Sequence, residues 1–126
     1  MSFVYIDMDK FKEINDTYGH DCGDTMLIMF SKKVREIIRS SDEFGRIGGD
    51  EFVVLLPETD RKGACEFERR LEEAFKTPIR CNGVDCYLSF SAGCASFPED
   101  GQNVEELLKV ADKRMYEAKK MKRSKR

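Results

Sequence analysis

Two pairs of acidic residues stand where carboxylates can bind a metal ion or accept a proton. Asp7 and Asp9 follow the apolar run Phe3–Ile6, and Asp50 and Glu51 follow two glycines. If the strand ending at Asp7 lies beside the hairpin that carries Asp50, these two carboxylates come close together. Such a pair suits Mg²⁺, a hard cation that takes oxygen ligands and keeps positions for water and phosphate. Taken alone, each pair is better explained as acids at a strand end or beside a turn.

The glycines before Asp50 predict a tight β-hairpin. Gly48 and Gly49 separate a strand-like segment from the apolar run Phe52–Leu56, and both central residues of such a turn need positive φ. A backbone without side chains also lets a bulky ligand approach closely.

Residues downstream of the first acidic pair have the chemistry to bind a nucleotide. Lys10, Phe11 and Lys12 open a predicted helix, whose first N–H groups bind phosphate well. Asn15 and Asp24 bracket a glycine-rich loop, and a carboxylate with an amide can together recognise a guanine edge. The alternatives are two lysines on a surface turn and, for Asp24, the N-cap of the next helix.

The hydrophobic pattern predicts the elements that position these residues. Apolar residues keep helical spacing in four segments and form strand-like runs in five. This order favours an α+β fold, with one mainly antiparallel five-stranded sheet surrounded by helices and a ferredoxin-like core. The predicted strands are Phe3–Ile6, Glu43–Ile47, Phe52–Leu56, Ile79–Cys81 and Tyr87–Phe97, the last two forming a hairpin about Asn82-Gly83, and the predicted helices begin at Lys10, Asp24, Asp60 and Asn103.

Length and composition exclude several classes of protein. The 126 residues fit one domain, and 22 basic against 24 acidic residues argue against a general nucleic-acid binder. No apolar run approaches the length of a membrane span. The five cysteines are odd in number and contain no Cys-x-x-Cys, which predicts free, reduced thiols in a cytosolic protein.

Several motifs in the same chain resemble the diguanylate cyclase (GGDEF) domain family. The match covers nearly all of the chain, so residues 1–126 are identified as a single domain of this family that lacks its N-terminal segment. The resemblance implies a fold related to nucleotidyl cyclases and palm-type polymerases. The matching segments are Asp7–Lys12, Ile14–Asp24, Arg46–Phe52, Ser91–Gly93 and Ala111–Lys119.

The resemblance implies that two GTP molecules condense to cyclic di-GMP with release of pyrophosphate, in a homodimer that uses Mg²⁺ or Mn²⁺. Asp50 and Glu51 would be catalytic, and Asp7, the carbonyl of Met8 and Asp50 would bind the metal. The implied substrate-binding residues are Lys10, Phe11, Lys12, Asn15, Asp24, Gly48, Gly49, Lys119 and Arg123.

The family also has a site for feedback inhibition by its product, which the resemblance assigns to Arg39 and Asp42 with Arg70 from another surface. An arginine in the last turn of a helix is the alternative for Arg39. The family's ending departs here, because Lys122 and Ser124 flank Arg123 where glycine and asparagine are usual.

The expected partners are a covalently attached sensory or receiver domain and a second copy of the chain, with no nucleic acid and no membrane contact by this segment. The expected location is the cytoplasm, including the cytoplasmic part of a larger membrane protein. The alternative function is a weak or inactive GGDEF domain that binds cyclic di-GMP or GTP, although the retained Asp50 and Glu51 count against it. A nucleic-acid-binding sheet domain ranks behind both, because the strand Phe52–Leu56 lacks the pattern of base-stacking aromatic residues beside basic ones, and the net charge is negative.

Overall fold

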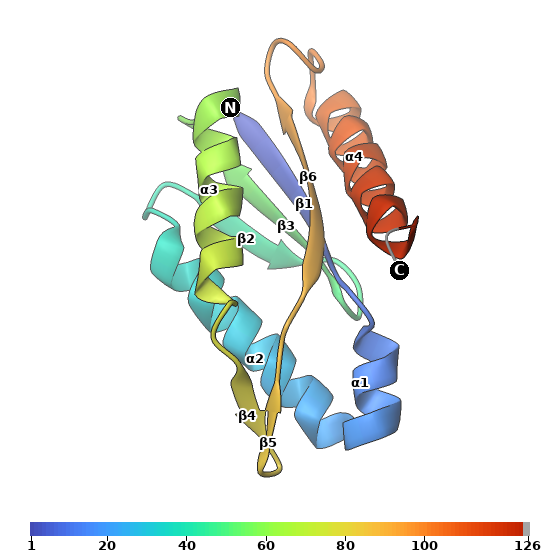
Figure 1. The fold of residues 1–126 in the computed structure, drawn as a ribbon. Helices are drawn as coiled ribbons and strands as arrows, with labels where there is room; N and C mark the ends of the chain where they lie inside the picture. The colour runs from blue at the N-terminus through green and yellow to red at the C-terminus, as the bar shows by residue number, and fades with distance from the viewer. Residues whose placement is uncertain (125–126) are drawn as a thin grey trace.

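The structure is a computed structural model that describes residues 1–124, with side chains as far as Lys122. Its centre is a four-stranded antiparallel sheet in which the first strand lies between the third and the sixth (Figure 1). The strand order is β2 (Glu43–Arg46), β3 (Glu51–Leu56), β1 (Ser2–Met8) and β6 (Phe90–Ser96).

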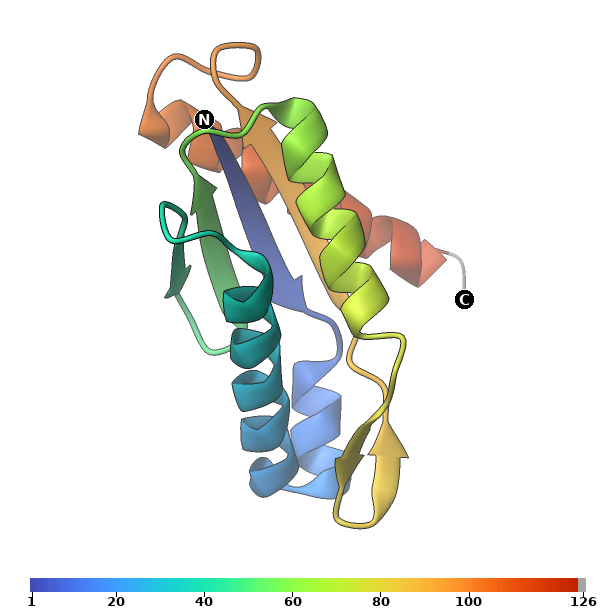
Figure 2. The same cartoon turned by 90° about the vertical axis from the view of Figure 1, so that its left-hand side faces the viewer.

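Helices cover both faces of this sheet. On one face lie α2 (His20–Ile37) and α3 (Arg61–Ala74), and on the other lies α4 (Val104–Ser124) (Figures 1 and 2). The short helix α1 (Phe11–Tyr18) follows β1 directly, at the same end of the molecule as a separate hairpin. This hairpin consists of β4 (Ile79–Cys81) and β5 (Val84–Cys86).

The alternation of side chains along β1 divides the core in two. Val4, Ile6 and Met8 are buried in the larger cluster, beneath α2 and α3. Phe3 is buried in the smaller cluster against α4, with Tyr5 packed beside it. Because successive side chains of a strand point to opposite faces, Asp7 continues the face of Phe3 and Tyr5. The strand therefore directs this carboxylate toward α4.

The α+β class and the mainly antiparallel sheet are confirmed, but the sheet has four strands and not five. The predicted pairing of Ile79–Cys81 with Tyr87–Phe97 is wrong, since β4 pairs with Val84–Cys86 and β6 pairs with β1. The reason is the turn at Asn82-Gly83. Its φ angles are 51° and 78°, as a two-residue hairpin turn requires, so the chain reverses at once and pairs with the next three residues.

Three of the four predicted helix starts are confirmed and one is wrong. Lys10 directly precedes α1. Asp60 accepts a hydrogen bond from the Gly63 N–H at 2.9 Å, and Asn103 accepts one from the Glu106 N–H at 2.9 Å, as N-caps do. The second helix begins at His20 rather than at Asp24, because α1 and α2 meet at the single residue Gly19 with φ of 94°. The predicted loop up to Asp24 is therefore mostly the first turn of α2.

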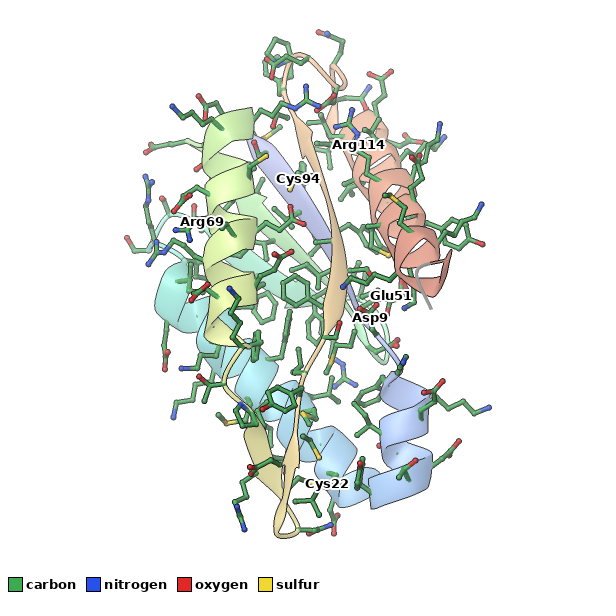
Figure 3. All side chains as sticks on the ribbon, viewed as in Figure 1. Asp9, Cys22, Glu51, Arg69, Cys94 and Arg114 are labelled. Carbon is green, nitrogen blue, oxygen red and sulfur yellow. A yellow bond between two sulfur atoms is a disulfide. The ribbon has the colours of Figure 1, made fainter. Side chains whose placement is uncertain are left out.

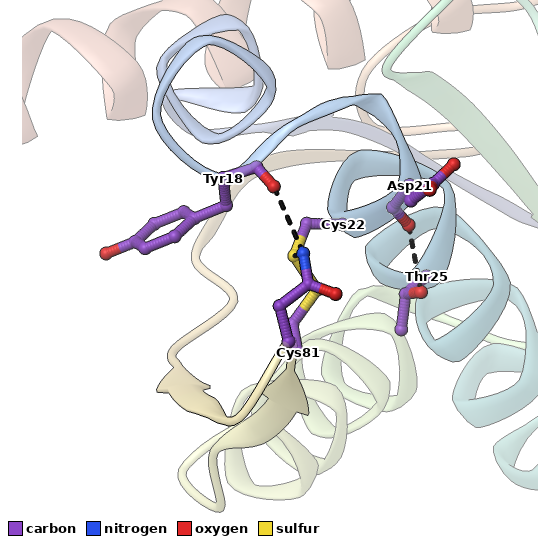
Figure 4. The surroundings of a disulfide bond; sticks show 6 residues. Tyr18, Asp21, Cys22, Thr25 and Cys81 are labelled. Atoms are coloured by element: carbon purple, nitrogen blue, oxygen red, sulfur yellow. Dashed lines mark hydrogen bonds between the residues drawn. A yellow bond between two sulfur atoms is a disulfide. The ribbon is translucent and has the colours of Figure 1, made fainter.

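The prediction that all cysteines are free thiols is wrong for two of them. Cys22 of α2 and Cys81 of β4 form a disulfide, with their Cα atoms 5.7 Å apart (Figure 4). Cys65, Cys86 and Cys94 are free. No helix among the described residues is both long and apolar enough to cross a bilayer.

Candidate active site

The structure brings Asp7 and Asp50 together at the end of β1. Asp7 lies opposite Glu51 in the antiparallel pair of β1 and β3, and the backbone N–H of Met8 donates to the Asp50 carbonyl at 3.0 Å. Burial raises the pKa of Asp7 above its ordinary value. Lys119 opposes this rise and the Asp50 carboxylate adds to it. Two acids thus share a partly buried site in which a full double negative charge is unfavourable without a cation.

The oxygens of Asp7 have different surroundings. Oδ2 forms an ion pair with the Nζ of Lys119 at 2.9 Å, and both side chains are less than one-fifth exposed. Oδ1 is buried and has no hydrogen-bond partner among the described residues. A buried oxygen without a partner costs free energy, and a cation held by Asp7 and Asp50 would remove that cost. The donor set of two carboxylates and the Met8 carbonyl therefore fits a hard divalent cation.

The candidate metal site at Asp7 and Asp50 would have few protein side chains. Within residues 1–122, no three His, Cys, Asp or Glu side chains form a group that could hold a metal ion. A cation at Asp7 and Asp50 would thus keep coordination positions for water or for a ligand's own oxygens. Such a shell is typical of Mg²⁺ in sites that bind phosphates.

The loop before Asp50 is not the turn that the two glycines predicted. Neither Gly48 nor Gly49 has positive φ. The loop is closed by a hydrogen bond from the Ile47 N–H to the Glu51 carbonyl at 2.8 Å. The guanidinium of Arg46 also donates to the carbonyls of Gly48 and Gly49, at 3.0 Å and 2.6 Å. Because Arg46 holds both carbonyls, the loop opens wider than a two-residue turn.

Glu51, the predicted partner of Asp50 in catalysis, is held by a residue that the sequence did not suggest. The hydroxyl of Tyr5 donates to Glu51 Oε1 at 3.0 Å. Burial and then this hydrogen bond raise the pKa of Tyr5 to about 12, so the phenol keeps its proton at neutral pH and remains a donor. The signal was present in the sequence, because Tyr5 and Asp7 share one face of a strand.

Asp9 has a different environment from Asp7. It accepts hydrogen bonds from Ser89 at 2.8 Å, Ser91 at 2.7 Å and the Nζ of Lys122 at 2.8 Å. Burial raises the pKa of Asp9, but these donors outweigh it, and the pKa lies below its usual value. Asp9 is therefore a junction that ties β1 to β6 and to the end of α4 (Figure 3). Lys122, a departure from the family's usual glycine, has its place in this junction.

Three of the predicted phosphate contacts, Lys10, Phe11 and Lys12, lie around the start of α1. Lys10 occupies the residue before the helix with φ of 56° and ψ of 29°, and its carbonyl accepts from the Ile14 N–H at 3.0 Å. Phe11 is half-buried against the main core, and Lys12 is exposed. The side chain of Arg123 lies outside the residues that the structure describes.

Asn15 and Asp24 come from different helices and meet through Gly23. A Cβ atom on Gly23 would lie 1.8 Å from Asn15 Oδ1, so the amide occupies the space that a side chain would take. Asp24 is the next residue of α2 and is exposed. The structure thus places the Asn15 amide against Gly23, the residue directly before Asp24, at the corner of α1 and α2. Gly23 was missed in the sequence, where it read only as part of a loop.

A pocket of about 540 Å³ lies between α1, the end of α4 and the segment before β6. Lys10 and Lys119, both predicted phosphate contacts, line it together with Lys122. Tyr18 and Tyr87 also line it, and they were not predicted. Its volume falls within the usual range for small-molecule sites.

The predicted product-binding residues lie away from this site. Arg39 and Asp42 share the turn between α2 and β2, in which the Arg39 N–H donates to Asp42 Oδ2 at 2.8 Å and the Asp42 N–H donates to the Arg39 carbonyl at 3.0 Å. Arg70 is an exposed residue of α3.

Comparison with known proteins identifies a family. Residues 1–125 match the model for the family described as diguanylate cyclase, GGDEF domain. Diguanylate cyclase DosC of Escherichia coli K12 is 40% identical over 122 residues, which are 95% of this chain and 26% of that protein. A protein of Pseudomonas aeruginosa named cyclic di-GMP phosphodiesterase NbdA is 38% identical over 119 residues, 94% of this chain and 15% of that protein. The chain thus spans less than a third of these relatives.

Solved structures agree with the fold. The GGDEF domain of TpbB (YfiN) from P. aeruginosa superposes with a TM-score of 0.90 at 37% identity, covering 95% of this chain and 71% of that one. A structure described as the active GGEEF domain of a diguanylate cyclase from Vibrio cholerae gives a TM-score of 0.85 at 29% identity, covering 94% and 76%.

Proposed function

Because the chain belongs to the GGDEF domain family, we propose that it is a diguanylate cyclase that joins two GTP molecules into cyclic di-GMP and releases pyrophosphate. The pairing of Asp7 and Asp50 carries the proposal. Asp7 has a buried oxygen without a hydrogen-bond partner among the described residues, and the nearby Asp50 carboxylate helps to raise the pKa of Asp7, so a bound cation would stabilise its charged form. Mg²⁺, or Mn²⁺ in its place, would be held by Asp7, Asp50 and the Met8 carbonyl and would neutralise phosphate charge when bound.

The residues of the chain have separate tasks in this proposal. Asp50 accepts the proton of the attacking 3′-hydroxyl, with Glu51 beside it fixed by Tyr5. Lys119, with Lys12 and Arg123, neutralises the triphosphate. Phosphoryl transfer needs positioning and charge neutralisation more than covalent help from the protein, and these residues supply both.

Asn15 and Asp24 select the base. The Asp24 carboxylate accepts from the ring N–H and exocyclic amine of guanine, and the Asn15 amide reaches the same edge. Each domain holds one GTP between this corner and the acids, with Gly48 and Gly49 leaving room for the nucleotide. Two domains must therefore face each other for in-line attack, so the active species is a homodimer.

The domain would be one part of a larger cytoplasmic signalling protein, or of the cytoplasmic portion of a membrane protein. It covers 15% to 29% of the curated relatives described as NbdA, DosC and TpbB, which supports an attached sensory or receiver domain. Feedback inhibition by cyclic di-GMP at Arg39 and Asp42, with Arg70, belongs to the same proposal.

A second candidate is a domain that binds cyclic di-GMP or GTP without turnover. It is favoured by one observation, that a relative of 38% identity is named a phosphodiesterase. The intact pair of Asp50 and Glu51 favours the cyclase.

Incubation with GTP and Mg²⁺, followed by mass spectrometry of the products, tests the proposal. We expect cyclic di-GMP, formed at a rate that rises more than linearly with protein concentration. Asp50→Ala should abolish the product and leave thermal unfolding unchanged, whereas Glu99→Ala, which removes an exposed acid of a distant loop, should keep full activity. If no product forms even when a fused coiled coil forces dimerisation, the cyclase proposal fails. Calorimetric binding of cyclic di-GMP without turnover would then favour the second candidate.

A further inference from the structure

The hairpin of β4 and β5 packs on the main core through Ile79, Cys81 and Cys86, and a few further groups fix its tip to the start of α2. It has only three residues in each strand, and an isolated two-stranded hairpin is marginally stable at best. At its tip, the amide of Asn82 donates to the Tyr18 carbonyl at 3.3 Å and to the Cys22 sulfur at 3.5 Å. The disulfide between Cys81 and Cys22 cross-links the hairpin to α2 (Figure 4).

Both attachments end on the corner that carries the candidate base-recognition residues. Cys22 directly precedes Gly23, which contacts Asn15, and Asp24 follows. Tyr18 is the last residue of α1. No residue of this helix is fully buried, and it packs on the core only through the partly buried side chains of Phe11 and Ile14. Its position depends on its neighbours, among them the contact of Asn15 with Gly23 and the contact of Tyr18 with Asn82.

We propose that the Cys22–Cys81 disulfide is a redox-sensitive latch that holds the corner of α1 and α2 in order. Reduction frees β4 from α2, loosens the hold on Tyr18, and lets Asn15 move relative to Asp24. The consequence for nucleotide affinity rests on the proposed function. The loosening of the corner does not.

The chemical step is a thiol–disulfide exchange with a dithiol reductant. Cys81 is 5% exposed and Cys22 is 0% exposed, so the reductant's thiolate attacks the sulfur of Cys81 once the hairpin opens. A mixed disulfide forms and Cys22 leaves as a thiolate. The second thiol of the reductant then closes on the first, which releases Cys81. Two electrons pass from the dithiol to the protein, and the reductant becomes a cyclic disulfide. A small-molecule disulfide reverses the step.

The first test needs no nucleotide. Thiol counting under denaturing conditions should find three thiols in the protein oxidised with glutathione disulfide and five after treatment with dithiothreitol, since Cys65, Cys86 and Cys94 are free. Hydrogen exchange, read by mass spectrometry, should be about tenfold faster in residues 15–24 and 79–86 of the reduced protein, because these segments open locally more often. Exchange in β1 and β3 should be unchanged.

Two variants separate the latch from a general effect of reductant. Cys81→Ser should exchange like the reduced wild type in both conditions. Cys65→Ser, which removes an exposed free thiol, should respond to reductant like the wild type. Five thiols in the oxidised wild type, or equal exchange of residues 15–24 in its oxidised and reduced forms, would overturn the proposal.

Nucleotide binding completes the test. The oxidised wild type should bind a non-hydrolysable GTP analogue with Mg²⁺ about fivefold more tightly than the reduced wild type, a coupling of ordinary size. Equal affinity in the two forms would overturn the link between the latch and base recognition. If reduction loosens the corner and the analogue binds in neither form, the latch stands and the proposed function fails.

Discussion

The Asn15 side chain fills the space that a side chain on Gly23 would take, since a Cβ atom on Gly23 would lie 1.8 Å from the Asn15 side-chain oxygen. The missing side chain of one residue therefore sets the position of the other. Because Asp24 follows Gly23, the contact also fixes the amide relative to the carboxylate with which it is proposed to recognise guanine.

Replacement of Gly23 by alanine should therefore weaken nucleotide binding. Alanine is a better helix former than glycine by about 1 kcal/mol, so propensity alone predicts a more stable helix. We expect the new methyl group to displace Asn15 instead and to reduce the affinity for a GTP analogue about tenfold, equal to about 1.4 kcal/mol. Gly45→Ala is the matched control, since no atom lies within 4 Å of its added Cβ. Equal affinity in Gly23→Ala and the wild type would contradict the positioning role.

Asp24 should decide between guanine and adenine. Asp24→Ser removes a charged acceptor of the guanine N–H groups, and such hydrogen bonds contribute about 1.5 to 3 kcal/mol. The preference for GTP over ATP in competition binding should fall at least about tenfold. Asp21→Ser, an exposed acid one turn earlier in α2, should leave the preference as it is. An unchanged preference in Asp24→Ser would remove Asp24 from base recognition.

The sequence predicts well those features that depend on local pattern. The apolar run before Asp7 predicts a strand, which the structure confirms as β1, and the alternation of its side chains determines which face the carboxylate takes. At the helix starts capped by Asp60 and Asn103, each side chain accepts a hydrogen bond from the backbone N–H three residues later. In each case the information lies within a few residues.

Features that depend on distant residues could not be predicted in this way. The disulfide joins two cysteines 59 residues apart, and Lys122 reaches Asp9 across 113 positions. The prediction of a tight turn at Gly48 and Gly49 was wrong for another reason. Its glycines permit positive φ but do not require it, and the guanidinium of Arg46 stabilises a wider loop.

Lys119 should weaken the binding of a divalent cation and strengthen the binding of a nucleotide. Its ammonium lies 2.9 Å from Asp7 Oδ2, where it competes with a divalent cation and later meets a triphosphate. In Lys119→Gln, the nucleotide-free protein should bind Mn²⁺ more tightly in a titration followed by electron paramagnetic resonance. The same variant should bind the GTP analogue about tenfold more weakly, since a charged hydrogen bond is lost. Lys109→Gln, on an exposed turn of α4, should change neither value. A parallel loss of both affinities would show that Lys119 does not compete for Asp7.

The ion pair of Asp100 with Arg114 should make stability depend on pH below neutrality. Asp100 accepts from Arg114 at 2.9 Å and from the Ser96 N–H at 2.9 Å, and the hydrogen bond from Arg114 lowers the pKa of this carboxyl. Because the pKa of Asp100 is lower in the folded state, its charge stabilises the fold at pH values above the pKa of the unfolded state, about 3.9. This stabilisation is lost as the pH falls through the pKa of the folded state. Asp100→Asn should therefore lower the free energy of unfolding by about 1 to 2 kcal/mol at pH 7, and this deficit should shrink at pH 3. Urea unfolding at both pH values measures it. Asp85→Asn, which breaks an exposed pair at 3.4 Å, should have no measurable effect, because such pairs contribute little. A deficit of the same size at pH 3 would mean that shape, and not charge, is what Asp100 supplies.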